Sequence, residues 1–125
     1  MEKKILASET LKTSGPYSCA VEAGGLIFIS GQLPVDPATG ELIPEIRPAA
    51  RQVLVNLQIL LEENGLALAN IVKTTIFLKN MTDFAAVNEI YAEFFSSQPP
   101  ARSTVEVASL PKGALLEIEA VAVRR

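Results

Sequence analysis

The chain has 125 residues, of which 49% are hydrophobic and 20% are charged, and its formal net charge is −3. These values are typical of one globular domain with a single core, and the acidic balance excludes a general attraction to nucleic acid or to anionic membranes. The chain contains no histidine and only one cysteine, which excludes histidine-based triads, Cys–His pairs, zinc clusters built within one chain and internal disulfides.

The first part of the chain is predicted to form strands. Residues 3–7 indicate a short edge strand. Residues 17–22 alternate loosely and residues 25–30 are strongly apolar, so the two segments predict a hairpin that turns at Ala23-Gly24. Residues 34–40 are rich in proline and glycine and therefore predict a loop with several turns.

A long helix is predicted next, beginning near Arg47-Pro48 and ending at Asn64-Gly65. Proline is tolerated in the first turn of a helix, and glycine suits the left-handed residue that follows the last turn. The spacing i, i+3, i+4, i+7 predicts one buried face. Its residues are Ala50, Val53, Leu54, Leu57, Leu60 and Leu61.

The second half is expected to alternate strand and helix. Residues 71–79 are β-branched and half alternating, which indicates a strand. Thr82 or Asp83 is expected to cap a second helix. Residues 96–101 are interpreted as a loop. The helix stripe comprises Phe84, Val87, Asn88, Tyr91 and Phe95, and the later elements are a strand at 103–108, a turn at 110–113 and a final strand at 115–123.

These elements predict an α+β fold, a mixed sheet of six strands with both helices packed on one face, as a single domain over residues 1–125. The other face needs a cover, because the strands carry more apolar surface than two helices readily shield. A homo-oligomer that packs sheet on sheet is expected to supply that cover. The apolar strand residues concerned are Leu26, Phe28, Val72, Ile76, Leu116 and Ile118.

A cytoplasmic location is the expectation. The single cysteine, Cys19, fits a reducing compartment, and a small buried hydrophobe is its simplest role. The apolar part of the N-terminal segment is too short for a signal peptide. No apolar run reaches the roughly 18 residues that a membrane span requires, so no membrane partner is expected.

Two charges in the least polar third of the chain outline a small-molecule site. Arg102 follows Pro99-Pro100, and its guanidinium fork matches a carboxylate. Glu117 interrupts an apolar run, and a glutamate in apolar surroundings can exchange protons near neutral pH. The alternatives are a surface arginine at a strand end and a solvent-facing glutamate that shares its face with Glu119.

Other polar residues fall where a ligand can approach. Asn88 lies inside the stripe of the second helix, and its amide needs either a structural partner or a ligand. Ser30-Gly31 ends an apolar strand, where a hydroxyl and a bare backbone permit close approach, although a plain exit from the strand explains it too. Tyr17 follows a Gly-Pro turn, and packing over the core is its ordinary explanation.

Seven short segments, spread over essentially the whole chain, match the motifs of one known protein family in order and spacing. They are Gly15-Pro16-Tyr17-Ser18, residues 29–34 (ISGQLP), 71–75 (IVKTT), 83–88 (DFAAVN), 100–108 (PARSTVEVA), 110–112 (LPK) and 117–120 (EIEA). In this order and spacing the chain resembles the RidA (YjgF) family of imine/enamine deaminases. The resemblance implies a chorismate-mutase-like fold and a homotrimer with three clefts between subunits. It also implies hydrolysis of 2-imino or 2-enamino acids, such as 2-aminoacrylate, to 2-keto acids and ammonia, with no metal or organic cofactor.

The same resemblance implies roles for individual residues. Arg102 is similar to the family's carboxylate-binding arginine, and Glu117 to the residue that orients water and shuttles protons. Two departures concern Thr104, which stands where many members have cysteine, and the loop 96–99, which is shorter than in typical members. The implied substrate-binding positions are Tyr17, Ser30, Gly31, Asn88, Arg102 and Thr104.

Three other functions use similar features. A metabolite-binding trimer without turnover fits the same cleft, but a passive carboxylate pocket gains nothing from Glu117 beside its ligand. A ribonuclease or translation inhibitor would need a basic stripe, which the sequence lacks. A chorismate mutase would need several cations around a dicarboxylate, and only Arg102 is well placed for that role.

Overall fold

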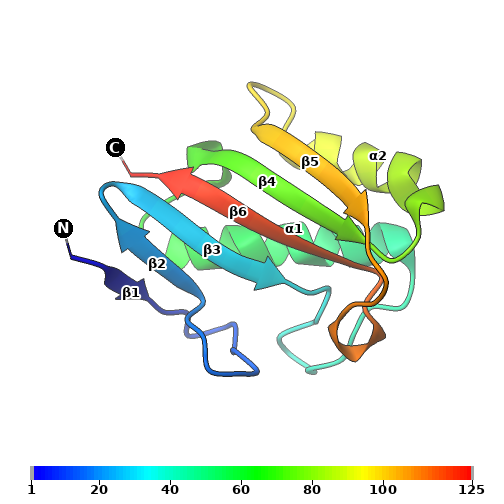
Figure 1. The fold of residues 1–125 in the computed structure, drawn as a ribbon, viewed down its shortest axis with the longest axis horizontal. Helices are drawn as coiled ribbons and strands as arrows, with labels where there is room; N and C mark the ends of the chain where they lie inside the picture. The colour runs from blue at the N-terminus through cyan, green and yellow to red at the C-terminus, as the bar shows by residue number, and fades with distance from the viewer. Residues whose placement is uncertain (1, 125) are drawn as a thin grey trace.

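The computed structural model describes residues 2–124. In this range six strands form one mixed sheet, and two α-helices lie side by side behind it, so that the other face of the sheet is uncovered (Figure 1). The predicted α+β architecture is confirmed. The elements are β1 (Lys4–Leu6), β2 (Ala20–Ala23), β3 (Leu26–Gln32), α1 (Ile46–Glu63), β4 (Ile71–Leu78), α2 (Phe84–Phe94), β5 (Ala101–Glu106) and β6 (Leu116–Val123).

The strand order is β1-β2-β3-β6-β4-β5, so the last strand of the chain lies near the middle of the sheet. All neighbouring pairs are antiparallel except β4 and β5, which are parallel and joined by α2. Such a parallel pair needs a crossover connection, which a helix supplies. The register of β3 against β6 shifts between Ile29 and Gln32, which places a bulge at Ser30-Gly31.

Helix α1 agrees with its sequence pattern. Pro48 lies in the first turn, and Gly65 follows the helix with a φ of +75°, in the left-handed region. The predicted apolar face is buried against the sheet, and no helix in residues 2–124 is long and apolar enough to cross a membrane. The buried residues are Ala49, Ala50, Val53, Leu54, Asn56, Leu57, Leu60 and Leu61.

Several details of these elements differ from the prediction. Strand β2 begins only at Ala20, because residues 17–19 belong to the preceding loop. Strand β5 begins at Ala101, two residues early, since its parallel register with β4 starts directly after Pro100. Asp83 stands at the N-cap of α2 but makes no capping hydrogen bond with its side chain, because a 3₁₀ turn over Met81–Asp83 leads into the helix.

The two faces of the sheet have different environments. Ile76, Leu116 and Ile118 face the helices and are fully buried, so these three of the six apolar strand residues need no further cover. The other three, Leu26, Phe28 and Val72, are exposed. The two helices therefore leave part of the apolar strand surface unshielded, as expected.

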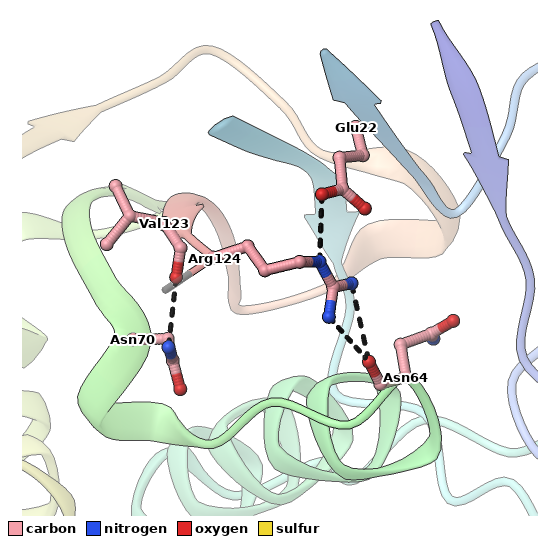
Figure 2. Close-up of polar contacts among 5 residues, drawn as sticks. All are labelled: Glu22, Asn64, Asn70, Val123 and Arg124. Carbon is pink, nitrogen blue, oxygen red and sulfur yellow. Dashed lines mark hydrogen bonds and ion pairs between the residues drawn. The ribbon is translucent and has the colours of Figure 1, made fainter. Parts of the chain in front are cut away.

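Polar contacts connect the end of β6 to the neighbouring elements (Figure 2). The Arg124 Nε donates to Glu22 Oε2 at 2.8 Å, and the Asn70 amide donates to the Val123 carbonyl at 2.9 Å. The Arg124 guanidinium also donates to the carbonyl of Asn64 at the end of α1. The hydrogen bond from Arg124 holds the pKa of Glu22 below its ordinary value. These contacts tie β2, α1 and β6 together.

Candidate functional site

Glu117 lies against a bare stretch of backbone. It is the second residue of β6 and pairs with Phe77, and its side chain points away from the helices. A methyl group added to Gly31 would collide with Glu117 Oε2 and would lie 2.7 Å from its Cδ. The absence of a side chain at Gly31 therefore makes room for the carboxylate, a close approach that only glycine allows.

The surroundings of Glu117 favour its protonated form. Partial burial raises the pKa of the Glu117 carboxyl, and the charge of Glu119, two residues along the same face of β6, raises it further. A carboxyl with a raised pKa is suited to give and take protons closer to neutral pH. Glu117 is therefore partly shielded from solvent, and its role in moving protons stays a prediction.

Ser30 and Tyr17 lie close to the same end of the sheet. The Ser30 hydroxyl donates to the carbonyl of Ser18 at 2.6 Å, and this bond ties the bulge in β3 to the preceding loop. Tyr17 is 50% exposed, so half of its surface is free to contact a ligand. Its hydroxyl accepts a long hydrogen bond of 3.4 Å from the backbone N–H of Ser14.

Arg102 is held over two aromatic rings of α2. Its guanidinium carbon lies 4.9 Å from the centroid of Tyr91 and 5.6 Å from that of Phe84, distances typical of cation–π contacts. The Tyr91 hydroxyl is 2.7 Å from the buried hydroxyl of Thr74, which fixes the ring. Within residues 2–124, no carboxylate lies within 4.0 Å of the guanidinium. The cation is oriented but not neutralised.

Two polar side chains accompany Arg102 without partners of their own. Asn88 lies between Phe84 and Tyr91 on the same stripe of α2, and in the described part of the chain its side chain makes no hydrogen bond. The structural hydrogen bond that was the alternative for Asn88 is therefore not formed there. The Thr104 hydroxyl, two residues after Arg102 on the same face of β5, is buried and has no hydrogen-bond partner among residues 2–124 either. The buried Thr104 hydroxyl is costly to leave without a partner, whereas Asn88 is only partly buried.

The register separates the predicted residues into two groups. Arg102 and Ala120 both pair with Thr74, so Arg102 lies on the side of the sheet that the helices cover. Glu117 points to the uncovered side, with Gly31 next to it. One chain therefore presents two half-sites, one with Arg102, Asn88 and Thr104, the other with Glu117, Gly31, Ser30 and Tyr17. It does not bring Arg102 and Glu117 into one pocket.

The sequence reasoning missed the aromatic support of Arg102. Phe84 and Tyr91 were interpreted as members of a buried stripe, whereas Phe84 is exposed and both rings lie under the guanidinium. The signal was present in the spacing. Two aromatic residues at i and i+7, with an amide at i+4 between them, indicate a polar face as well as a packed one.

A family model described as Endoribonuclease L-PSP matches residues 7–124. A relative from Salmonella typhimurium named 2-iminobutanoate/2-iminopropanoate deaminase is 46% identical, and the alignment covers all of both chains. A RutC family protein from Pyrococcus horikoshii is 48% identical, with 98% of each chain covered.

Solved structures share the whole fold. The crystal structure of the YjgF gene product from Escherichia coli matches with a TM-score of 0.92 and 48% identity, covering 98% of this chain and 99% of that one. The structure of Escherichia coli TdcF with bound serine matches with a TM-score of 0.93 and 41% identity, again covering 98% and 99%.

Proposed function

Because the chain belongs to the Endoribonuclease L-PSP family, which is the YjgF/RidA family, we propose that it hydrolyses reactive 2-imino and 2-enamino acids to 2-keto acids and ammonia. Relatives named 2-iminobutanoate/2-iminopropanoate deaminase, at 46% and 47% identity over their full lengths, support this activity at the level of the family. Arg102 is proposed to bind the substrate carboxylate and Glu117 to manage protons.

The observation that carries the proposal is the unpaired guanidinium of Arg102. Tyr91 and Phe84 hold it in one place, and the unpartnered hydroxyl of Thr104 lies on the same face of β5. A planar carboxylate can accept two parallel hydrogen bonds from such a fork. Binding of this kind holds the adjacent C2 carbon in a defined place, which is the main requirement for attack on an already electrophilic imine.

The proton steps are assigned to Glu117. The carboxylate takes a proton from a water molecule while the water oxygen bonds to C2 and the C=N electrons move to nitrogen. Glu117 then returns this proton to the nitrogen, which gives a carbinolamine with one hydroxyl and one amino group on C2. Glu117 next takes the proton of the hydroxyl and passes it to the amino nitrogen, so that the C–N bond breaks, ammonia leaves and the oxygen remains as the keto group. General acid–base catalysis of this kind accelerates a reaction by roughly 10²- to 10⁴-fold.

The site is proposed to form between copies of the chain in a homotrimer. The support is geometric, because Arg102 and Glu117 lie on opposite sides of one sheet. A pocket that contains both then needs Arg102 from one copy and Glu117 from the neighbouring copy. The exposed apolar residues on the open face, among them Phe28 and Leu26, are suited to be covered by such an assembly.

A second candidate is a small-metabolite binder without turnover. The matching structure of TdcF holds serine, which shows that a relative with this fold binds an amino acid. Binding alone would use the half-site of Arg102, and it would gain nothing from Glu117 and its raised pKa. The family model is described as an endoribonuclease. A net charge of −3 gives this chain no general attraction to RNA, so RNA cleavage is not the function proposed.

The test follows keto-acid release from an imino acid that an amino-acid oxidase generates in the cuvette. The wild type should accelerate release above spontaneous hydrolysis. Arg102→Ala should raise KM most, and Glu117→Gln should lower kcat most. Arg47→Ala is a matched control, because Arg47 is exposed and, within residues 2–124, its one ion pair is with Glu89 on the outer surface. Full activity of either site variant would refute the assignment, and binding of the keto acid without turnover would favour the second candidate.

A further inference from the structure

A cavity of about 310 Å³ lies beside the half-site of Glu117. Three loops gather along the lower side of the sheet in Figure 1, and together with the end of β3 and one residue of α1 they enclose this cavity. Tyr17 and Gly31, two of the predicted substrate-binding residues, form part of its wall. Its volume is within the range of small-molecule sites, and a substrate with a one- or two-carbon side chain would leave most of it empty.

The charge of the cavity wall has one sign. Both charged residues in the wall are lysines, Lys12 and Lys112, although the whole chain is acidic. Among residues 2–124, neither lysine has a carboxylate within 4.0 Å. The remaining polar wall groups are hydroxyls and amides, which are neutral. Two exposed lysines at its wall, with no acidic residue among the lining residues, give the cavity a positive character that suits an anion.

Lys112 is also held in an unusual backbone conformation. Its φ is +59°, in the left-handed region, where a residue other than glycine or asparagine is rare. The turn that contains it, Pro111–Gly113, is closed by a hydrogen bond from Ala114 N to the Pro111 carbonyl and leads directly into β6, the strand of Glu117. Backbone conformations of this kind occur more often at ligand sites than elsewhere, so Lys112 at the cavity wall is a candidate ligand contact.

Another part of the cavity wall, the loop after β3, is hydrogen-bonded to helix α1. Asn56 of α1 is buried, and its amide donates to the carbonyls of Val35 at 2.9 Å and Leu33 at 3.3 Å. Its own oxygen accepts a hydrogen bond from Gln52 at 2.9 Å. These hydrogen bonds tie the loop after β3 to α1 and support this part of the cavity wall.

From these observations we propose that the cavity binds the second carboxylate of dicarboxylic 2-imino acids, with Lys112 and Lys12 as its cationic partners. This inference rests on the proposed function and names a substrate class for the same site. Gly31 borders both the Glu117 carboxylate and the cavity, so in this proposal C2 lies beside Glu117 and the substrate side chain extends past Gly31 and Tyr17 into the cavity. Imino acids derived from glutamate or aspartate carry their second negative charge at the end of such a side chain.

The experiment compares 2-iminoglutarate with 2-iminobutanoate, each generated by an amino-acid oxidase, in the wild type and in three variants. Lys112→Asn removes the charge and keeps a residue that tolerates the left-handed conformation. Lys112→Arg keeps the charge, and Lys12→Gln removes the second cation. We expect Lys112→Asn to lower kcat/KM for 2-iminoglutarate about tenfold, the loss of one charge-assisted hydrogen bond, with 2-iminobutanoate changed less than about twofold.

We expect Lys112→Arg to retain the preference, and Lys12→Gln to weaken it in the same direction as Lys112→Asn. Equal losses for both substrates in Lys112→Asn would overturn the inference, because they would indicate a purely structural role for the turn. A wild type that hydrolyses 2-iminobutanoate but not 2-iminoglutarate would overturn it as well, and the proposed function would stand. If neither imine is hydrolysed, the proposed function itself fails.

A binding measurement separates a substrate subsite from an independent anion site. Glutarate, a stable dicarboxylate, is titrated into the wild type and into Lys112→Asn, and its effect on 2-iminobutanoate hydrolysis is measured. Competitive inhibition that weakens in Lys112→Asn supports the inference. Binding of glutarate without competition would overturn it, since the cavity would then hold an anion apart from the substrate.

Discussion

The carboxylate of Glu117 occupies the space above Gly31 that any side chain at that position would need. The two residues come from neighbouring antiparallel strands, β6 and β3, at the bulge where their register shifts. The contact makes the position of the proposed proton carrier depend on a residue that has no functional group.

Gly31→Ala is therefore predicted to lower the activity of the protein and to leave its stability almost unchanged. The backbone of Gly31 is not in the left-handed region, so alanine adopts it without strain, and the cost falls on the Glu117 carboxylate, which has to move. We expect kcat/KM for a 2-imino acid to fall by about 10²-fold, the lower end of the range for a misplaced acid–base group, with the thermal midpoint almost unchanged.

The matched control is Gly65→Ala at the end of α1. There the φ of +75° strains alanine, while the space around a Cβ is empty. We expect this variant to lose about 1 kcal/mol of unfolding free energy with normal kcat/KM. If the two glycines show the reverse pattern, the steric account of Gly31 is wrong.

The pH profile is predicted to report Glu117. As a general base it has to be ionised, so kcat/KM rises with pH through its pKa, and burial places this limb at a higher pH than an ordinary glutamate would give. Glu119 adds to the upward shift by charge repulsion. Glu119→Gln should therefore move the limb to lower pH, but not abolish the shift, since burial is the larger cause. Glu89→Gln, on the outer face of α2, should leave the profile in place.

Mixing the two site variants, each of low activity, is predicted to restore activity. Arg102 and Glu117 face opposite sides of the sheet, so a complete pocket takes each from a different copy. When Arg102→Ala and Glu117→Gln are unfolded together and refolded, random assembly gives about a quarter of pockets with both native residues. Activity near that fraction of wild type is expected. No recovery from a mixture that sizes as an oligomer on gel filtration would contradict a site shared between copies.

The buried pair of Tyr91 and Thr74 is predicted to show strong coupling. Their hydroxyls are 2.7 Å apart, and Thr74 is inaccessible to solvent. Tyr91→Phe leaves the threonine hydroxyl without a partner and should cost about 1–3 kcal/mol in urea denaturation. The double variant Tyr91→Phe with Thr74→Val removes both polar groups and should recover most of that loss. Additive losses in the double-mutant cycle would exclude this hydrogen bond as the cause.

The helix α1 and the strands β4 and β6 were predicted well because their patterns are local. The apolar spacing in residues 50–61 is set by the 3.6-residue period of a helix, and alternation from Leu116 to Val123 is set by the period of two in a strand. The start of β5 was less accurate. It depends on the register that β4 imposes on Ala101, a contact between segments that are more than 20 residues apart in the chain.

The amino-acid sequence by itself determined the set of chemical groups, the order of the elements and the alternation that puts Glu117 and Glu119 on one side of their strand. Only the tertiary structure decided that Arg102 lies on the side of the sheet that the helices cover, whereas Glu117 lies on the open side. The tertiary structure also decided that Gly31 makes room for the carboxylate, and that two lysines distant in the chain line one cavity. Alternation within a strand relates only neighbours on that strand. Which strands pair, and in which register, depends on packing over the whole core, and a single bulge at Ser30-Gly31 changes which side chains meet.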